Sequence, residues 1–121
     1  MSLFQSGRFI SHAGNELEWK IECDALTDED WECLAKMISY RIRFGSVYGI
    51  PRGGTKLANA LEQYITPGHP LNLVVDDVYT TGKSMKDVMK EGDFGFVIFA
   101  RKRIPYDPKF YIRALFTMDI I

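Results

Sequence analysis

The segment from Leu73 to Met85 is the feature that most restricts what this chain can fold into. An apolar run, typical of a strand buried on both faces, ends on Asp76 and Asp77. A small hydroxyl-rich turn follows directly, and a short helical pattern follows the turn. Carboxylates accept hydrogen bonds from sugar hydroxyls, and loop amides with a helix N-terminus hold anions. This order of elements therefore predicts a sugar-phosphate site.

The rest of the chain alternates helical and apolar-strand patterns. An aromatic, β-rich segment comes first, at residues 3–23. Helices are predicted from Thr27 towards Gly45, where Ile42 is the last apolar residue at helical spacing, and over 55–64 and 84–90. Core strands are predicted over 46–50, 71–75, 95–100 and 111–118. The alternation predicts an α/β fold with a mainly parallel central sheet flanked by helices.

We expect a single domain, with a small N-terminal segment over 1–25 and an α/β core over 26–121. Ligands of such sheets bind at the carboxyl ends of the strands. Three unusual features follow successive core strands, namely the loops 51–55 and 76–84 and the side chain of Arg101. They are therefore expected to meet at one edge of the sheet.

Composition excludes several classes of protein. The 121 residues carry a net charge of −1, which argues against non-specific binding to nucleic acid. No apolar run approaches the length of a membrane span, and the first residues do not resemble a secretory signal. Cys23 and Cys33 form no metal-ligand motif, so we expect reduced cysteines in a cytoplasmic protein.

Adjacent acids at the end of a strand also occur in other structural and functional contexts. Adjacent acids at the end of a strand can be solvated or can cap a helix, but their repulsion favours a bound partner. Gly82-Lys83-Ser84 is similar to the end of a nucleotide triphosphate P-loop, yet Asp77 stands where that motif requires glycine. A phosphoacceptor receiver domain has its acid pair after the first strand, whereas a helix and a strand precede this pair.

The segment resembles the phosphoribosyl diphosphate signature of the type I phosphoribosyltransferases almost residue for residue. This resemblance implies that Asp76 and Asp77 are the catalytic pair, which holds the ribose hydroxyls and contacts Mg²⁺ indirectly, through substrate or water. It also implies a 5′-phosphate loop made of Thr80, Thr81, Gly82, Lys83 and Ser84. The family usually has glycine or alanine at the position of Lys83. The backbone amide of Lys83 can still donate a hydrogen bond to a phosphate.

A second motif runs from Gly49 to Thr55 and resembles the pyrophosphate loop of the same family. The resemblance implies that pyrophosphate is bound by Pro51, Arg52, Gly53 and Gly54. Glycines allow backbone amides to approach an anion closely, and Arg52 adds a fixed charge. An ordinary strand-to-helix turn is the alternative. Because the family often has a cis peptide in this loop, we predict a non-proline cis bond near Arg52.

A weaker third match covers Phe9 to Gly14, followed by Trp19. It looks like the N-terminal hood of the orotate branch of the family, which covers the base. The resemblance implies base contacts from His12, Trp19 and Arg101. Each has an alternative as a solvated or core-capping side chain.

The chain departs from the orotate branch in one place. That branch has a long catalytic loop before the signature strand, whereas here only Thr66 to Pro70 separate the helix from the strand. His69 is the only ionisable residue in this connector. The transfer reaction needs Mg²⁺, positive charge on the leaving group and exclusion of water.

The resemblance predicts an enzyme of nucleotide metabolism that transfers phosphoribosyl from 5-phosphoribosyl 1-diphosphate to a nitrogenous base, with Mg²⁺ as cofactor. The short connector leaves open a non-catalytic sensor that binds the diphosphate or a nucleotide, and a fold kept for a structural purpose. Aromatic residues near the C-terminus, including Tyr106 and Phe116, predict a homodimer.

Overall fold

The computed structural model describes residues 1–10 and 14–118 and contains two sheets. Strands β1 (Phe4–Ile10) and β2 (Glu16–Ile21) form an antiparallel hairpin, which we call the hood. The second sheet is entirely parallel, in the order β3-β4-β5-β6. Its strands are β3 (Ser46–Gly49), β4 (Asn72–Tyr79), β5 (Phe94–Ala100) and β6 (Tyr111–Thr117). The predicted α/β class and parallel central sheet are confirmed.

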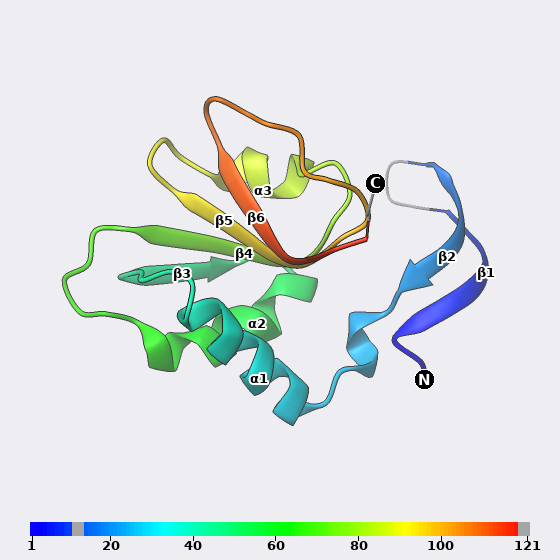
Figure 1. The fold of residues 1–121 in the computed structure, drawn as a ribbon, viewed down its shortest axis with the longest axis horizontal. Coiled ribbons are helices and arrows are strands. Elements are labelled where there is room, and N and C mark those ends of the chain that lie inside the picture. The colour runs from blue at the N-terminus through cyan, green and yellow to red at the C-terminus, as the bar shows by residue number, and fades with distance from the viewer. Residues whose placement is uncertain (11–13, 119–121) are drawn as a thin grey trace.

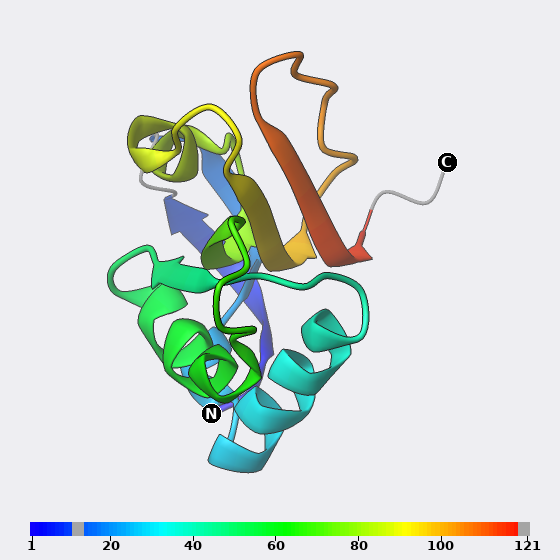
Figure 2. The ribbon, with the colours of Figure 1, turned by 90° about the vertical axis from the view of Figure 1, so that its left-hand side faces the viewer.

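Helices cover both faces of the parallel sheet (Figures 1 and 2). Helices α1 (Asp28–Ser39) and α2 (Gly53–Leu61) pack on one face, where Ile38, Leu57 and Leu73 are fully buried. Helix α3 (Lys83–Val88) packs on the other face through Met85. Single 3₁₀ turns, η1 (Cys23–Ala25) and η2 (Glu62–Tyr64), precede α1 and follow α2. None of the helices within the described ranges is long and apolar enough to cross a membrane.

Helix α1 begins as predicted but ends earlier. The side chain of Thr27 accepts a hydrogen bond from the Asp30 amide, and the Asp30 carboxylate accepts one from the Thr27 amide. The helix ends at Ser39 instead of continuing to Ile42. The Arg41 amide donates to the Ile38 carbonyl, which tightens the last turn and leads to the fully buried side chain of Phe44. Burial of Phe44 therefore overrides the helical spacing.

The acid pair lies inside a strand and not in the loop after it, which corrects the sequence prediction. Strand β4 continues through Tyr79, because Val78 pairs with Phe99 and Tyr79 pairs with Ala100. Asp76 itself pairs with Val97. The sheet ladder thus extends across the acids, and their backbone is held by β5.

The hood lies beyond the carboxyl ends of the core strands (Figure 1). Because β3, β4 and β5 are adjacent and parallel, the segments that follow them meet at this same edge. The edge is therefore bounded by two loops, the end of β5 and the hood.

Candidate functional site

The two neighbouring carboxylates of β4 line different cavities. Asp76 lines a small cavity, of about 40 Å³, together with the turn over residues 78–85. Asp77 lines a cavity of about 420 Å³ next to the loop that follows β3. Successive side chains of a strand point to opposite faces of a sheet, so the two acids line different cavities although their carboxyl groups stay close enough to interact. A ligand lying across the end of β4 can therefore contact one acid on each side.

The surroundings of Asp76 favour its protonated form. Burial raises the pKa of Asp76 to about 8, and a side-chain hydrogen bond and charge repulsion from Asp77 act in the same direction. The Asp77 amide donates to Oδ1 of Asp76 at 2.8 Å, which opposes part of this shift. The repulsion expected between adjacent acids is thus relieved by protonation. A ligand that donates hydrogen bonds or brings a cation favours the ionised form.

The turn over residues 80–84 forms the wall of the smaller cavity. Gly82 has φ 77°, a left-handed conformation that side chains rarely adopt, and a Cβ there would collide with the ring of Tyr79. The Thr81 hydroxyl accepts a hydrogen bond from the Lys83 amide at 3.3 Å. The Lys83 ammonium lies 2.8 Å from the Asp87 carboxylate on the next turn of α3. The positive charge of Lys83 is therefore partly neutralised by Asp87.

The loop after β3 lies directly beside Asp77. The peptide bond between Pro51 and Arg52 is cis, as predicted. A Cβ at Gly53 would overlap the Asp77 carboxylate, so the loop backbone approaches the acid as only glycine allows. Helix α2 begins at Gly53 without a side-chain cap or an acidic residue in its first turn. Its N-terminus therefore carries an uncompensated partial positive charge at the edge of the cavity.

The larger cavity includes residues that the sequence reasoning missed. They come from η1, α1 and the first turn of α2, and comprise Cys23, Asp24, Trp31 and Lys56. Lys56 could have been found, because it lies one helical turn beyond Arg52, the residue that precedes α2. The other three precede β3 by more than ten residues and have no local signal. Burial raises the pKa of Cys23 to about 12, and nearby carboxylates add to the shift, so its thiol is no nucleophile at neutral pH.

Two of the predicted base-contact residues lie together. The Arg101 guanidinium stacks 3.6 Å from the centroid of the Trp19 ring, and Nη1 donates to the Trp19 carbonyl at 2.9 Å. This contact joins the end of β5 to strand β2 of the hood. His12 lies outside the described residues, so its predicted contact stays a prediction.

The connector between α2 and β4 is short and lies at the amino end of β4. The Thr66 amide donates to the Phe44 carbonyl, and the Gly45 amide donates to the Leu71 carbonyl. His69 accepts a hydrogen bond from the Leu71 amide through Nδ1. These bonds hold the connector against the segment before β3, away from the carboxyl edge that carries the acids.

The acid pair offers oxygen donors of the kind that magnesium takes. Mg²⁺ prefers oxygen donors in an octahedron and commonly keeps waters and substrate phosphates in its shell. Asp76 and Asp77 would contact such a shell indirectly, through substrate or water. Within the described residues no three His, Cys, Asp or Glu side chains gather into a metal-binding group. The donor set therefore suits an ion completed by a phosphate ligand better than one held by protein alone.

Comparison with known proteins identifies the fold. No protein-family model and no curated protein match the sequence. The orotate phosphoribosyltransferase of Aeropyrum pernix superposes with a TM-score of 0.74 at 16% identity, over 96% of this chain and 89% of that chain. The orotate phosphoribosyltransferase of Mycobacterium tuberculosis H37Rv, solved with Fe(III) dicitrate, superposes with a TM-score of 0.65 at 15% identity, over 95% of this chain and 89% of that chain. Leishmania donovani UMP synthase gives 0.71 at 15% identity, over 96% of this chain and 34% of that chain.

Proposed function

We propose that this chain, which has the type I phosphoribosyltransferase fold in the form seen in orotate phosphoribosyltransferases, binds 5-phosphoribosyl 1-diphosphate and transfers its phosphoribosyl group to a nitrogenous base. One observation carries the proposal. The adjacent acids of β4 separate a small cavity walled by the turn 80–84 from a larger one beside the loop 51–54. A ribose across the acids would direct its 5′-phosphate to the first and its diphosphate to the second.

The chemistry follows from this arrangement. Asp76 and Asp77 accept hydrogen bonds from the ribose hydroxyls, and ionisation of Asp76 is favoured once a cation or a donor arrives. Mg²⁺, held through the acids and the substrate oxygens, supplies charge neutralisation of the diphosphate when bound. Arg52 and the N-terminus of α2 stabilise the negative charge that develops on the leaving diphosphate. The base attacks from the side covered by the hood.

The test is turnover by the full chain. Purified protein is incubated with 5-phosphoribosyl 1-diphosphate, Mg²⁺ and a panel of purine and pyrimidine bases, orotate included. We expect one base to yield a nucleotide and an equal amount of pyrophosphate, and a double variant, Asp76→Asn with Asp77→Asn, to yield neither. Absence of nucleotide from every base would remove the enzyme proposal.

A second candidate is a non-catalytic sensor of the same diphosphate or of a nucleotide. The short connector at the amino edge favours it, because residues 65–71 do not reach the acids to exclude water. Calorimetry separates the candidates: tight binding of the donor without turnover of any base supports the sensor.

We further propose a cytoplasmic homodimer. Cys23 and Cys33 are both free thiols, which suits a reducing compartment. Tyr111 and Phe116, on opposite faces of the outer strand β6, are each about half exposed and flank the sheet edge at which a second copy can pair. A monomeric mass in solution at micromolar concentration would contradict the dimer.

A further inference from the structure

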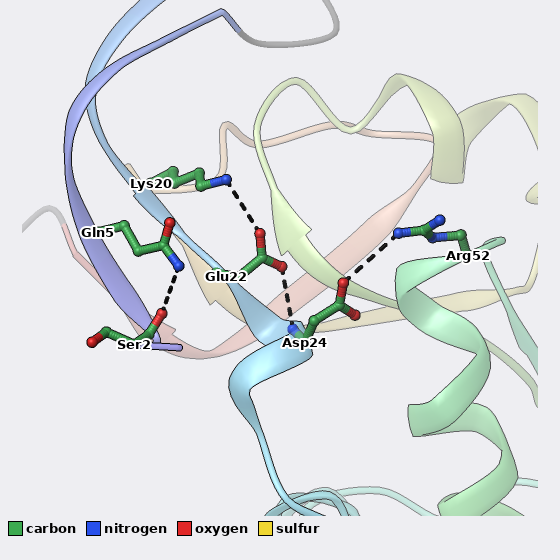
Figure 3. A network of polar contacts seen from close by, with 6 residues as sticks. All are labelled: Ser2, Gln5, Lys20, Glu22, Asp24 and Arg52. Atoms are coloured by element: carbon green, nitrogen blue, oxygen red, sulfur yellow. Dashed lines mark hydrogen bonds and ion pairs between the residues drawn. The ribbon is translucent and has the colours of Figure 1, made fainter.

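An ion pair crosses from the hood side of the molecule to the loop after β3. Nη2 of Arg52 lies 3.7 Å from Oδ2 of Asp24 in η1 (Figure 3). Glu22 holds the backbone of Asp24 in place, because its Oε1 accepts a hydrogen bond from the Asp24 amide. Oε2 of Glu22 pairs in turn with the Lys20 ammonium at 3.3 Å. A carboxylate of the protein thus occupies an anion position beside the main cavity.

The same cavity is lined by hydrogen-bond donors that do not pair with the Asp24 carboxylate. Lys56 lines the cavity and forms no ion pair with any residue in the described ranges. Trp31 also lines it, and the Trp31 indole nitrogen is the one buried side-chain polar atom of the described chain that lacks a hydrogen-bond partner. Trp31 is only 4% exposed, so leaving this N–H unpaired is costly. The nitrogen itself is buried from solvent, so a ligand in the cavity does not reach it, and Lys56 is the donor that remains available.

We propose, on the basis of the function proposed above, that this cavity binds the diphosphate group, with Lys56 as a donor, and that Asp24 is an internal anion which the diphosphate displaces from Arg52. The uncapped N-terminus of α2 lies at the same wall and favours an anion there. A volume of about 420 Å³ accommodates a diphosphate with its waters.

The charges make displacement of Asp24 feasible. The side chains of Arg52 and Asp24 are 91% and 54% exposed, so their ion pair contributes little to stability and exchanges readily. Two carboxylates, from Asp24 and Asp77, face two cations, from Arg52 and Lys56. Asp77 opposes an anion, and it is the acid proposed to share Mg²⁺ with the diphosphate. Movement of Asp24 away from Arg52 leaves the cavity with a net positive lining.

Binding of inorganic pyrophosphate to the full chain, measured by calorimetry with Mg²⁺, tests the proposal through variants of opposite sign. Lys56→Met should weaken binding about tenfold, because it removes a charge-assisted hydrogen bond. Asp24→Asn should tighten binding about threefold, because it removes the competing anion. Lys36→Met, an exposed lysine of α1 outside the cavity, is the matched control and should change nothing. Equal or weaker binding by Asp24→Asn overturns the displacement, and unchanged binding by Lys56→Met overturns the site.

Ribose 5-phosphate, titrated into the same variants, separates this inference from the function it rests on. Its affinity should be the same in all of them, since it lacks the diphosphate. If ribose 5-phosphate binds but the pyrophosphate series shows no difference between variants, the inference fails and the proposed function stands. If the pyrophosphate series behaves as expected and ribose 5-phosphate does not bind, the anion site stands and the phosphoribosyl function fails.

Discussion

The phosphate-facing loops and the hood are built in different ways. The loops after β3 and β4 continue directly from core strands, and their shapes depend on the glycines at 53 and 82 and on the cis peptide at Arg52. The hood forms its own two-stranded sheet, with most side chains of β1 exposed. Side-chain contacts link it to the core, notably Arg101 on Trp19 and an edge-on contact between Phe4 and Phe99.

This difference teaches that the two halves of the site can be altered separately. Loops whose backbone is fixed by a parallel sheet lose function when a glycine or an acid changes. A hairpin held by few side chains opens when one contact is removed, because small isolated hairpins are only marginally stable. Changes at the sheet edge should therefore affect the ribose and phosphates, and changes at the hood should affect the base.

The largest effect is expected at the acid pair. Asp76→Asn with Asp77→Asn should weaken binding of 5-phosphoribosyl 1-diphosphate by about a hundredfold or more, because two carboxylate acceptors and their indirect contacts with Mg²⁺ are lost together. Calorimetry measures the loss. Asp28→Asn, at the exposed start of α1, is the control and should bind as the parent chain does. Unchanged donor affinity in the double variant would mean that the ribose lies elsewhere.

Gly53→Ala should weaken donor binding about tenfold, because the new Cβ would displace the Asp77 carboxylate. A double-mutant cycle with Asp77→Ala tests this cause. Once the carboxylate is absent, Gly53→Ala should have little further effect. Additive losses would instead point to a change in the loop backbone.

The hood contact is tested by Arg101→Lys, which keeps the charge and loses the planar stack on Trp19. Amide hydrogen exchange in β2 should speed up by about tenfold while the affinity for ribose 5-phosphate stays constant. Arg103→Lys, on the exposed part of the next loop, should leave exchange unaltered. A higher KM for the base, with normal amide hydrogen exchange in β2, would show that Arg101 contacts the base directly and does not hold the hood.

The smallest effect concerns pH and the stability of the fold. The pKa of Asp76 is about 8 in the folded protein against 3.8 as the ordinary value, so between these pH values the folded state holds the extra proton. The free energy of unfolding therefore falls as pH rises through this window and levels off above it. Asp76→Asn should be more stable than the parent at pH 8 and should lose that advantage near pH 4. Urea unfolding at both pH values measures the difference, and a constant difference would contradict the assignment.

The phosphate-facing half could be predicted from the sequence because its determinants are local. The apolar run before Asp76, the glycine of the turn and the loop around Arg52 are each contained in fewer than ten residues, and the sheet order then brings them together. The position of the acids inside β4 was missed, since strand pairing of Val78 and Tyr79 depends on β5. Pairing with β5 therefore extends β4 beyond the point at which its apolar pattern ends.

The cavity beside Asp77 and the hold on the hood could not be predicted, because they depend on residues far apart in the chain. Asp24 and Arg52 are brought together by the packing of η1 near α2, and Arg101 reaches Trp19 across 82 positions. No spacing in the sequence reports such contacts. Trp31 has the period of a core residue, and its unpaired N–H is visible only once its surroundings are known.

The opposite orientations of Asp76 and Asp77 have a consequence for how this protein can change length. Deleting or inserting one residue between Leu73 and Asp76 would exchange the faces of both acids and direct each into the wrong cavity. The segment from 102 to 109, which joins β5 to β6, is subject to no such rule and can lengthen at little cost where the contact of Asp107 with Lys86 is kept. Natural variants and engineered fusions should therefore place insertions in that segment and keep the count of residues in β4 fixed, even where its apolar side chains are exchanged.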